Sequence, residues 1–388
     1  MTLITVGAGD EVWEKFGHNM IEIRGDPGYG RDVAFNWGLF DFDQPHFLRR
    51  FMQGRMLYTM RAIPSDIVLD EYRLNQRQAI FQKLNLTPRQ IDRLIQLCEI
   101  NRTRPDYHYD YFRDNCSTRV RDMLDQATDG ELKRILAAKQ PRTDLTYRQH
   151  TVRLTQNDLL VSLGIDLAMG PDGDRPLSNW EAAFLPSRLS AGITPLVTSS
   201  EARWPSLRPP EPEAVPDRRL PFLVAGVLGS ALMASLAMSK LKWFRRFAST
   251  LAIAWLILGT LGSVLMLYLW GFTDHVAAYA NQNLWQFSPV AIAILIAWWL
   301  ARRVAATPAS FISAGVDGMG DAGVADTRSA RPVLTLLAAS ILLSLIGLVG
   351  NLAGVFSQQN LPFILLALPL HLAAGLTVMR STGLIRQP

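Results

Sequence analysis

Cys116 could act as a nucleophile because of its position at the start of a predicted helix. Asp114 or Asn115 is a natural N-cap, and apolar residues follow at helical spacing: Val120, Met123, Leu124 and Ala127. A thiol in the first helical turn meets unpaired backbone N–H groups and the positive end of the helix dipole, which favour the thiolate. We therefore predict Cys116 as the nucleophile, with Asn115 and Ser117 supporting an oxyanion at the helix N-terminus.

The general base for such a thiol would be a histidine, oriented by a third polar group. Two β-like runs, residues 18–23 and 33–38, flank a cluster of Gly, Pro and Asp and predict a hairpin. Pairing the end of the first run with the start of the second places Met20 opposite Asn36. His18 then lies within about two residues of Asn36 across the ladder. The sequence thus predicts His18 as the base and Asn36 as its orienting group.

Other interpretations of the two cysteines stay open at this stage. Cys116 could be a small buried apolar residue at a helix start, since free cysteine is among the most buried residue types. Cys98 lies on the apolar face of a predicted helix over residues 88–101, which favours simple burial, with a disulfide to Cys116 as the minor alternative. Two cysteines without an HExxH motif do not suggest a metal site, and we expect none.

The composition divides the chain into a polar half and an apolar half. Residues 220–388 carry only 10 of the 39 Lys and Arg and 4 of the 34 Asp and Glu. Basic residues that flank apolar stretches indicate membrane topology and make nucleic-acid binding improbable. Five stretches are long enough to cross a bilayer as helices: residues 220–238, 247–270, 285–301, 333–356 and 362–379.

Lysines and arginines predict the orientation of these spans. They concentrate between the first and second spans, between the third and fourth, and after the fifth, and such segments remain cytoplasmic. Residues 1–219 are therefore expected outside and the C-terminus inside. Met1–Asp10 lacks the features of a signal peptide, so we expect either an export signal or anchor upstream, which the charge pattern favours, or the reverse orientation.

We divide the chain into an α+β domain over residues 1–200, a Pro-rich linker over 201–219, and an all-α bundle of about five transmembrane helices over 220–388. One apolar cluster of the first domain is either ordinary core or a lipid-facing mouth. Its members are Phe40, Phe42, Phe47, Phe51, Met52, Met56 and Leu57.

Five blocks within residues 3–190 also follow one another in a recognisable order: GAGDEVWEKFGHNMIEI, FNWGLFDF, FMQGRMLYTM, YDYFRDNCSTRVRD, and GIDLAMGPDGDRP with EAAFLP. In this order they resemble the N-terminal extracytoplasmic domain of the Lnb family, lipoprotein N-acyltransferases that make lyso-form lipoproteins. The family's arrangement, an extracytoplasmic domain joined to several membrane spans, agrees with the topology expected from charge.

The resemblance implies a permuted papain-like (NlpC-type) fold, in which the histidine precedes the cysteine. It assigns catalytic roles to His18 and Cys116, with Asn36 as third member. Cys116 would take the sn-2 acyl chain of a diacylglyceryl lipoprotein as a thioester and pass it to the α-amine of the lipoprotein's first cysteine, without a cofactor. The implied location is the bacterial inner membrane, with a periplasmic N-terminal domain, a cytoplasmic C-terminus, and membrane lipids and lipoproteins as partners.

Two other classes of function remain to be distinguished from this one. The first is a cysteine hydrolase of the same fold that cleaves cell-wall peptides or lipids with water as acceptor. The second is a non-catalytic membrane-associated binding module.

Overall fold

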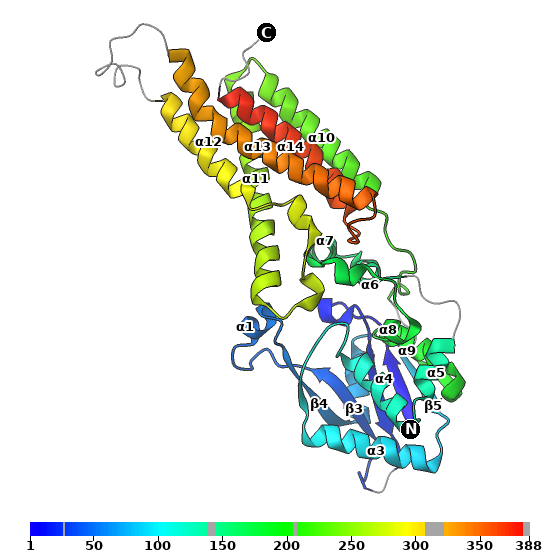
Figure 1. The fold of residues 1–388 in the computed structure, drawn as a ribbon. Coiled ribbons are helices and arrows are strands. Elements are labelled where there is room, and N and C mark those ends of the chain that lie inside the picture. Colours follow the sequence, from blue (N-terminus) through cyan, green and yellow to red (C-terminus); the bar gives the residue numbers. More distant parts are fainter. Residues whose placement is uncertain (26–27, 139–144, 205–207, 307–321, 383–388) are drawn as a thin grey trace. The chain divides into compact units, whose positions relative to one another are not determined.

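The computed structural model describes residues 1–25, 28–138, 145–204, 208–306 and 322–382, which fall into two compact units (Figure 1). The first unit comprises Met1–Asp166, Asp174–Pro216 and Thr273–His275. The second comprises Leu167–Gly173, Asp217–Phe272 and Val276–Pro388. Each unit is described by itself.

An antiparallel sheet, seven-stranded within the described residues, forms the centre of the first unit in the order β6-β4-β3-β2-β1-β5-β7. The strands are β1 (Thr2–Val6), β2 (His18–Ile23), β3 (Val33–Leu39), β4 (Leu57–Pro64), β5 (Ala79–Leu84), β6 (Asp106–His108) and β7 (Val197–Arg203). The predicted hairpin is β2 and β3. Its register pairs Ile23 with Val33 and Met20 with Asn36, so the predicted register is confirmed.

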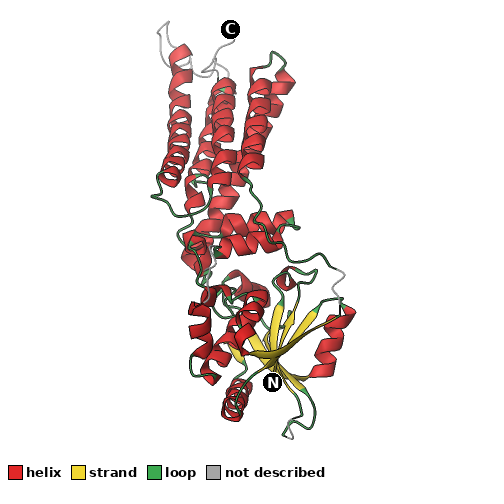
Figure 2. Ribbon diagram, turned by 90° about the vertical axis from the view of Figure 1, so that its right-hand side faces the viewer, coloured by secondary structure: helices red, strands yellow, loops and turns green. Residues whose placement is uncertain are grey.

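Helices cover both faces of this sheet (Figure 2). The helices between β1 and β7 in the sequence are α1 (Phe47–Met52), α2 (Ser65–Leu74), α3 (Pro88–Thr103), α4 (Cys116–Ala127), α5 (Glu131–Ala138), α6 (Tyr147–Thr155), α7 (Leu159–Ala168), α8 (Asn179–Ala182) and α9 (Pro186–Gly192), with short 3₁₀ helices η1 (Val12–Glu14), η2 (Pro171–Asp174) and η3 (Thr194–Leu196). Leu94 of α3 and Leu124 of α4 enter one core, and Val68 of α2 enters the core on the opposite face. The sequence and structure therefore agree on a domain of sheet and helices.

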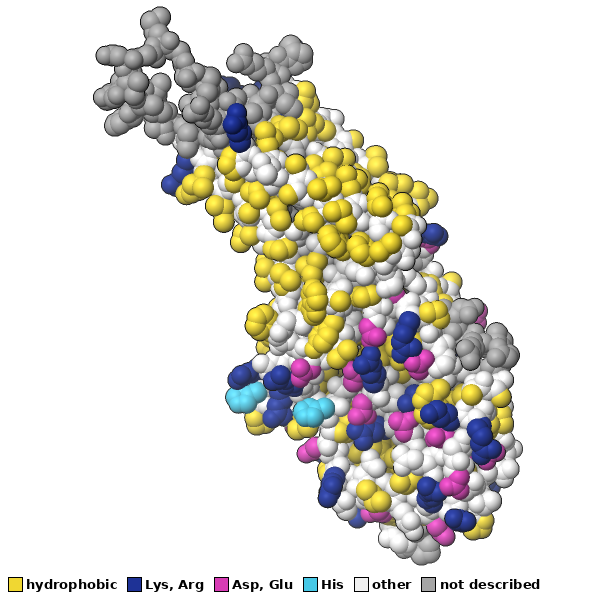
Figure 3. Space-filling model, viewed as in Figure 1, with side chains coloured by type: hydrophobic (Ala, Val, Ile, Leu, Met, Phe, Trp, Pro, Cys, Tyr) yellow, Lys and Arg dark blue, Asp and Glu magenta, His cyan; other side chains and the backbone are white. Residues whose placement is uncertain are grey.

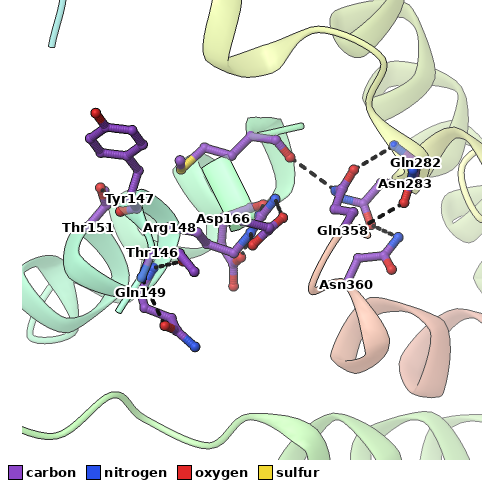
Figure 4. Close-up of polar contacts among 12 residues, drawn as sticks. Thr146, Tyr147, Arg148, Gln149, Thr151, Asp166, Gln282, Asn283, Gln358 and Asn360 are labelled. Atoms are coloured by element: carbon purple, nitrogen blue, oxygen red, sulfur yellow. Dashed lines mark hydrogen bonds and ion pairs between the residues drawn. The ribbon is translucent and has the colours of Figure 1, made fainter. Parts of the chain in front are cut away.

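A buried ion cluster in the first unit joins Arg148 of α6 to Asp166 of α7 and to Asp174, the last residue of η2 (Figure 4). The Arg148 guanidinium donates to Asp174 Oδ1 at 2.8 Å and to Asp166 Oδ1 at 2.9 Å, and all three side chains are nearly inaccessible to water. Two carboxylates neutralise a cation that could not be buried alone. Burial opposes the charge of Arg148, but both aspartates outweigh it and raise the pKa of the guanidinium.

The predicted linker over residues 201–219 begins later than expected. Residues 201–203 are the last of β7 and pair with β5, because the sheet extends by one edge strand that carries no clear sequence signal. Glu211 accepts a hydrogen bond from Arg153 of α6 at 2.6 Å, so part of the segment is held against the first unit. Residues 205–207 lie outside the described residues.

The second unit consists mainly of long apolar helices: α10 (Arg219–Met238), α11 (Lys242–Phe272), α12 (Val290–Ala306), α13 (Ala322–Leu352) and α14 (Leu361–Ser381), with η4 (Val276–Ala278) and η5 (Gln282–Trp285) between α11 and α12. Amide side chains of Gln282, Asn283, Gln358 and Asn360 form a hydrogen-bonded cluster with Asn281 in the loops of this unit (Figure 4).

Four helices in the described residues are long and apolar enough to span a membrane: α10, α11, α14 and the Arg331–Leu352 part of α13. The third predicted span, residues 285–301, is not one helix. The chain bends by 42° between Val276–Trp285 and Val290–Arg303, and the pair makes a fifth span only if both parts belong to it. Pro289 has no N–H to continue a helix from Trp285, so α12 begins after it.

Candidate active site

The cap of α4 fixes Cys116 in the first turn of that helix. Asn115 Oδ1 accepts from the Thr118 N–H at 2.9 Å, and Thr118 Oγ1 accepts from the Asn115 N–H at 2.7 Å. The amide nitrogen of Asn115 donates to the carbonyls of Tyr111 and Phe184 at 2.9 and 3.0 Å. The helix start is therefore anchored on three sides, and the Asn115 carboxamide is already fully occupied as a cap.

Ser117 contributes to the site through its backbone. Its hydroxyl donates to the Ala183 carbonyl at 2.8 Å and is completely buried. Its N–H group hydrogen-bonds the Cys116 sulfur, as does the N–H of Asn19. Both predicted supporting residues thus adjoin the thiol: the side chains of Asn115 and Ser117 anchor the helix start, and the Ser117 N–H faces the sulfur.

His18 and Asn36 lie on neighbouring strands and on the same face of the sheet, since side chains alternate along each strand. The ring nitrogen Nε2 of His18 is 2.6 Å from Asn36 Oδ1. An amide oxygen only accepts, so Nε2 carries the hydrogen and Nδ1 is left for the thiol. His18 also hydrogen-bonds Cys116, and the three predicted residues are therefore brought together.

The electrostatics of the pair favour a thiolate beside an imidazolium. Burial opposes ionisation of Cys116, but the His18 charge, the His18 hydrogen bond and the two backbone N–H groups outweigh it and lower the thiol pKa. Burial likewise disfavours a charged His18, yet Cys116 and the Asn36 hydrogen bond raise the pKa of the ring. Shifts in these opposite directions are characteristic of a reactive cysteine.

Tyr72 is a member of the site that sequence reasoning missed. It comes from α2, is buried, hydrogen-bonds the Asn36 side chain, and places its ring 6.3 Å from the His18 ring. The Arg77 guanidinium lies 5.0 Å from the centre of the Tyr72 ring and is bound to Glu14 at 2.7 Å. No local pattern indicates Tyr72, because its contact depends on packing of α2 against the sheet.

Two glycines allow the main chain to approach the site closely. Gly38 has φ +84°, and a Cβ there would lie 3.3 Å from the Cys116 Cβ. Gly17, next to His18, has φ +77°, and a Cβ there would lie 2.7 Å from the Val6 carbonyl oxygen. The FGHN and NWGL motifs contain these glycines. The sequence therefore shows where the glycines are, but the close approach of the main chain that requires them is visible only in the structure.

Aromatic rings connect the site with a patch of exposed apolar side chains. Tyr109 lies beside Gly38 and Cys116 and stacks on Tyr58 at 4.1 Å, and Tyr58 contacts Phe40 at 4.9 Å. Phe40 in turn contacts Trp13 at 5.7 Å. We name the exposed group the aromatic patch: Val12, Trp13, Phe42, Leu48, Phe51 and Met52, each between 39% and 67% exposed. Part of the predicted apolar cluster is thus surface, whereas Met56 belongs to the core.

Cys98 is buried in the core and unpaired, and so is Cys116, which excludes the disulfide alternative. Burial raises the pKa of the Cys98 thiol, as expected for a cysteine that serves only as packing. Among the described residues, no group of three or more His, Cys, Asp or Glu side chains is placed to hold a metal ion.

The first unit is thus a sheet-and-helix domain with a thiol and an imidazole paired where β2 and α4 begin. Residues 1–154 match the family model of the Lnb N-terminal periplasmic domain, and this part of the chain is accordingly of the Lnb type. No curated protein and no solved structure matches the chain. Together with the apolar helices, the match defines a membrane protein with an extracytoplasmic N-terminal domain.

Proposed function

We propose that the protein is a membrane-bound thiol acyltransferase that moves the sn-2 acyl chain of a diacylglyceryl lipoprotein to the α-amine of its N-terminal cysteine. The observation that carries this proposal is the hydrogen-bonded set of Cys116, His18 and Asn36, with the thiol pKa lowered and the imidazole pKa raised. The Lnb-type domain supplies the substrate class, and the apolar helices keep the enzyme where such substrates reside.

The reaction has two steps that balance without a cofactor. The Cys116 thiolate attacks the sn-2 ester carbonyl, the ester C–O bond breaks, and His18 gives its proton to the departing glycerol oxygen. The α-amine then attacks the thioester, its proton passes to His18, and the C–S bond breaks to restore the thiolate. Backbone N–H groups at the start of α4 are suited to the oxyanion of both steps.

The aromatic patch supports a lipid substrate over a peptide. Trp13 is 50% exposed and Phe42 57%, and large apolar groups on a surface usually mark contact with a partner or a membrane. Trp13 belongs to η1, shortly before His18, and its ring contacts connect it with Tyr109 beside the thiol. We infer that the aromatic patch receives the acyl chains.

We also infer that the fold of the first unit is a permuted papain-like one of the NlpC type, in which the histidine precedes the cysteine in the chain.

The test uses the full chain in detergent with a diacylglyceryl lipopeptide whose sn-2 chain is isotopically labelled. We expect mass spectrometry to find the label on the N-terminal amine, with little labelled free fatty acid. Cys116→Ala and His18→Ala should each abolish transfer, whereas Cys98→Ala should retain it with a stability loss of about 1 kcal/mol.

A second lipopeptide, acetylated on its amine, separates the remaining possibilities. Full-rate release of free fatty acid from this peptide would establish water as acceptor and replace the transferase with a hydrolase. Absence of any acyl transfer or cleavage by the folded wild-type chain would instead favour a binding module.

A further inference from the structure

Basic side chains converge at one end of the second unit, where α10, α12 and α14 end and α11 begins. Lys242, Arg245 and Arg246 come from the first turns of α11, Arg302 from α12 and Arg380 from α14. The preference of Lys and Arg for the cytoplasmic side accounts for their being at this end. This preference alone does not explain why five cations from three helices surround a single cavity.

These residues surround a cavity of about 380 Å³. Its wall also includes small side chains, Ala237, Ser249 and Thr377, which are buried and leave room between the helices. Ser381 completes the wall and accepts a hydrogen bond from Trp298 at 2.9 Å, which ties α12 to α14 beside the cavity. The cavity is therefore formed by helices that are fixed to one another.

The charge in this cavity is of one sign. Among the described residues that line it, five are basic and none is acidic. On α11, Lys242 lies three and four residues before Arg245 and Arg246, spacings at which like charges repel. The same cations lie at a helix N-terminus without an acidic residue in the first turn, although that end of a helix favours anions. An anion bound in the cavity would relieve the repulsion between these cations and would also interact favourably with the start of α11.

The surroundings place the cavity at the depth of lipid headgroups. Trp243 stacks on Phe244 with ring centres 3.8 Å apart, and Trp299 lies under the Arg303 guanidinium at the same distance. Exposed Trp side chains beside Lys and Arg are typical of the boundary between hydrocarbon and water. Figure 3 shows hydrophobic side chains over much of the visible face of the helices and basic side chains at one end.

We propose that this cavity binds a phosphate group, and that the phosphate is the headgroup of an anionic phospholipid. Arginine forks match phosphate oxygens in pairs, and basic pockets between membrane helices are suited to such headgroups. This site is separate from the thiol site and does not depend on the proposed acyl transfer.

The experiment measures lipid retention by the full chain in neutral detergent by native mass spectrometry. Phosphatidylglycerol and phosphatidylcholine with the same chains are offered together. We expect the anionic lipid to be retained roughly tenfold more, and the preference to disappear in Arg302→Gln and in Arg246→Gln. Arg303→Gln is the matched control, since it removes the same charge from the neighbouring residue outside the cavity. Melting curves of each variant confirm folding.

A second arm titrates inorganic phosphate and pyrophosphate against the bound lipid. Displacement of phosphatidylglycerol at low millimolar concentration, from the wild-type chain and from Arg303→Gln alike, would replace the lipid headgroup with a free anion as the ligand of the phosphate site, whereas retention of the lipid supports the headgroup. Equal retention of both lipids, or equal effects of Arg302→Gln and Arg303→Gln, overturns the proposal.

Discussion

Asn36→Ala removes the side chain that orients His18, and one hydrogen bond sets the size of its effect. Asn36 Oδ1 accepts from His18 Nε2 at 2.6 Å, and the side chain is only 1% exposed, so water cannot readily replace it. A hydrogen bond to a charged group contributes about 1.5–3 kcal/mol. Loss of this hydrogen bond should shift the equilibrium from the ion pair toward the neutral thiol and imidazole by about 10- to 150-fold.

The sign of the pH effect follows from the two pKa shifts. The ion pair exists above the lowered pKa of Cys116 and below the raised pKa of His18. Without Asn36 the imidazolium is less stabilised, so its pKa falls and the basic limb moves to lower pH. The thiol loses part of its counter-ion, so its pKa rises and the acidic limb moves to higher pH. The pH range in which the thiolate reacts should therefore narrow from both sides.

The rate of Cys116 alkylation by iodoacetamide, followed by peptide mass spectrometry across pH, measures this directly and needs no knowledge of the substrate. Asn101→Ala is a matched control, because Asn101 Oδ1 also accepts from a ring nitrogen, Trp37 Nε1 at 3.3 Å, and its amide nitrogen donates to the Leu97 carbonyl at 2.9 Å. An unchanged profile in Asn36→Ala, or the same narrowing in Asn101→Ala, would refute the assigned role of Asn36.

Three further predictions concern backbone, core and topology. Gly38→Ala should lower the stability of the fold by about 1–3 kcal/mol and remove most of the activity, because Gly38 has a positive φ and lies close to the nucleophile. Gly25 also has a positive φ but has open space around it, so Gly25→Ala should retain activity in the lipopeptide assay. Arg148→Met should destabilise the chain by about 3–5 kcal/mol by removing the cation that neutralises two buried carboxylates; an unchanged melting temperature would contradict this. Reporter fusions after Gln359 and after Pro388 should give external and cytoplasmic signals respectively, and the reverse pattern would exclude the orientation expected from charge.

Local signals made the pairing of His18 with Asn36 and the place of Cys116 at a helix start predictable. Turn residues and strand lengths determine the register of β2 and β3, and an N-cap followed by helical spacing locates Cys116 at the start of α4. Both features depend on residues that are close in sequence. The meeting of strand and helix was not determined by spacing alone, and there the resemblance of the FGHN and DNCSTR blocks to a family contributed.

The remaining parts of the site depend on contacts between distant segments. The N–H of Asn19 faces the Cys116 sulfur because β2 and α4 meet. Tyr72 reaches Asn36 because α2 packs on the face of the sheet opposite to the one that α3 and α4 cover. The break before Val290 has a different cause, a proline within an apolar stretch. An apolar average over residues 285–301 conceals the effect of a single proline on the helical hydrogen bonds.

The raised pKa of His18 has a consequence for the order of events in the proposed reaction. Burial is the largest influence on this ring and opposes its charge, while the strongest opposing influences both come from Cys116. Once the sulfur carries an acyl group, that negative charge is gone, and burial and the nearby Arg77 favour loss of the proton. An amine that arrives early meets an imidazolium and keeps its proton, whereas one that arrives after acylation meets a base. The protonation state of His18 thus ensures that the amine is activated only after the thioester has formed, and this order requires no movement of the chain.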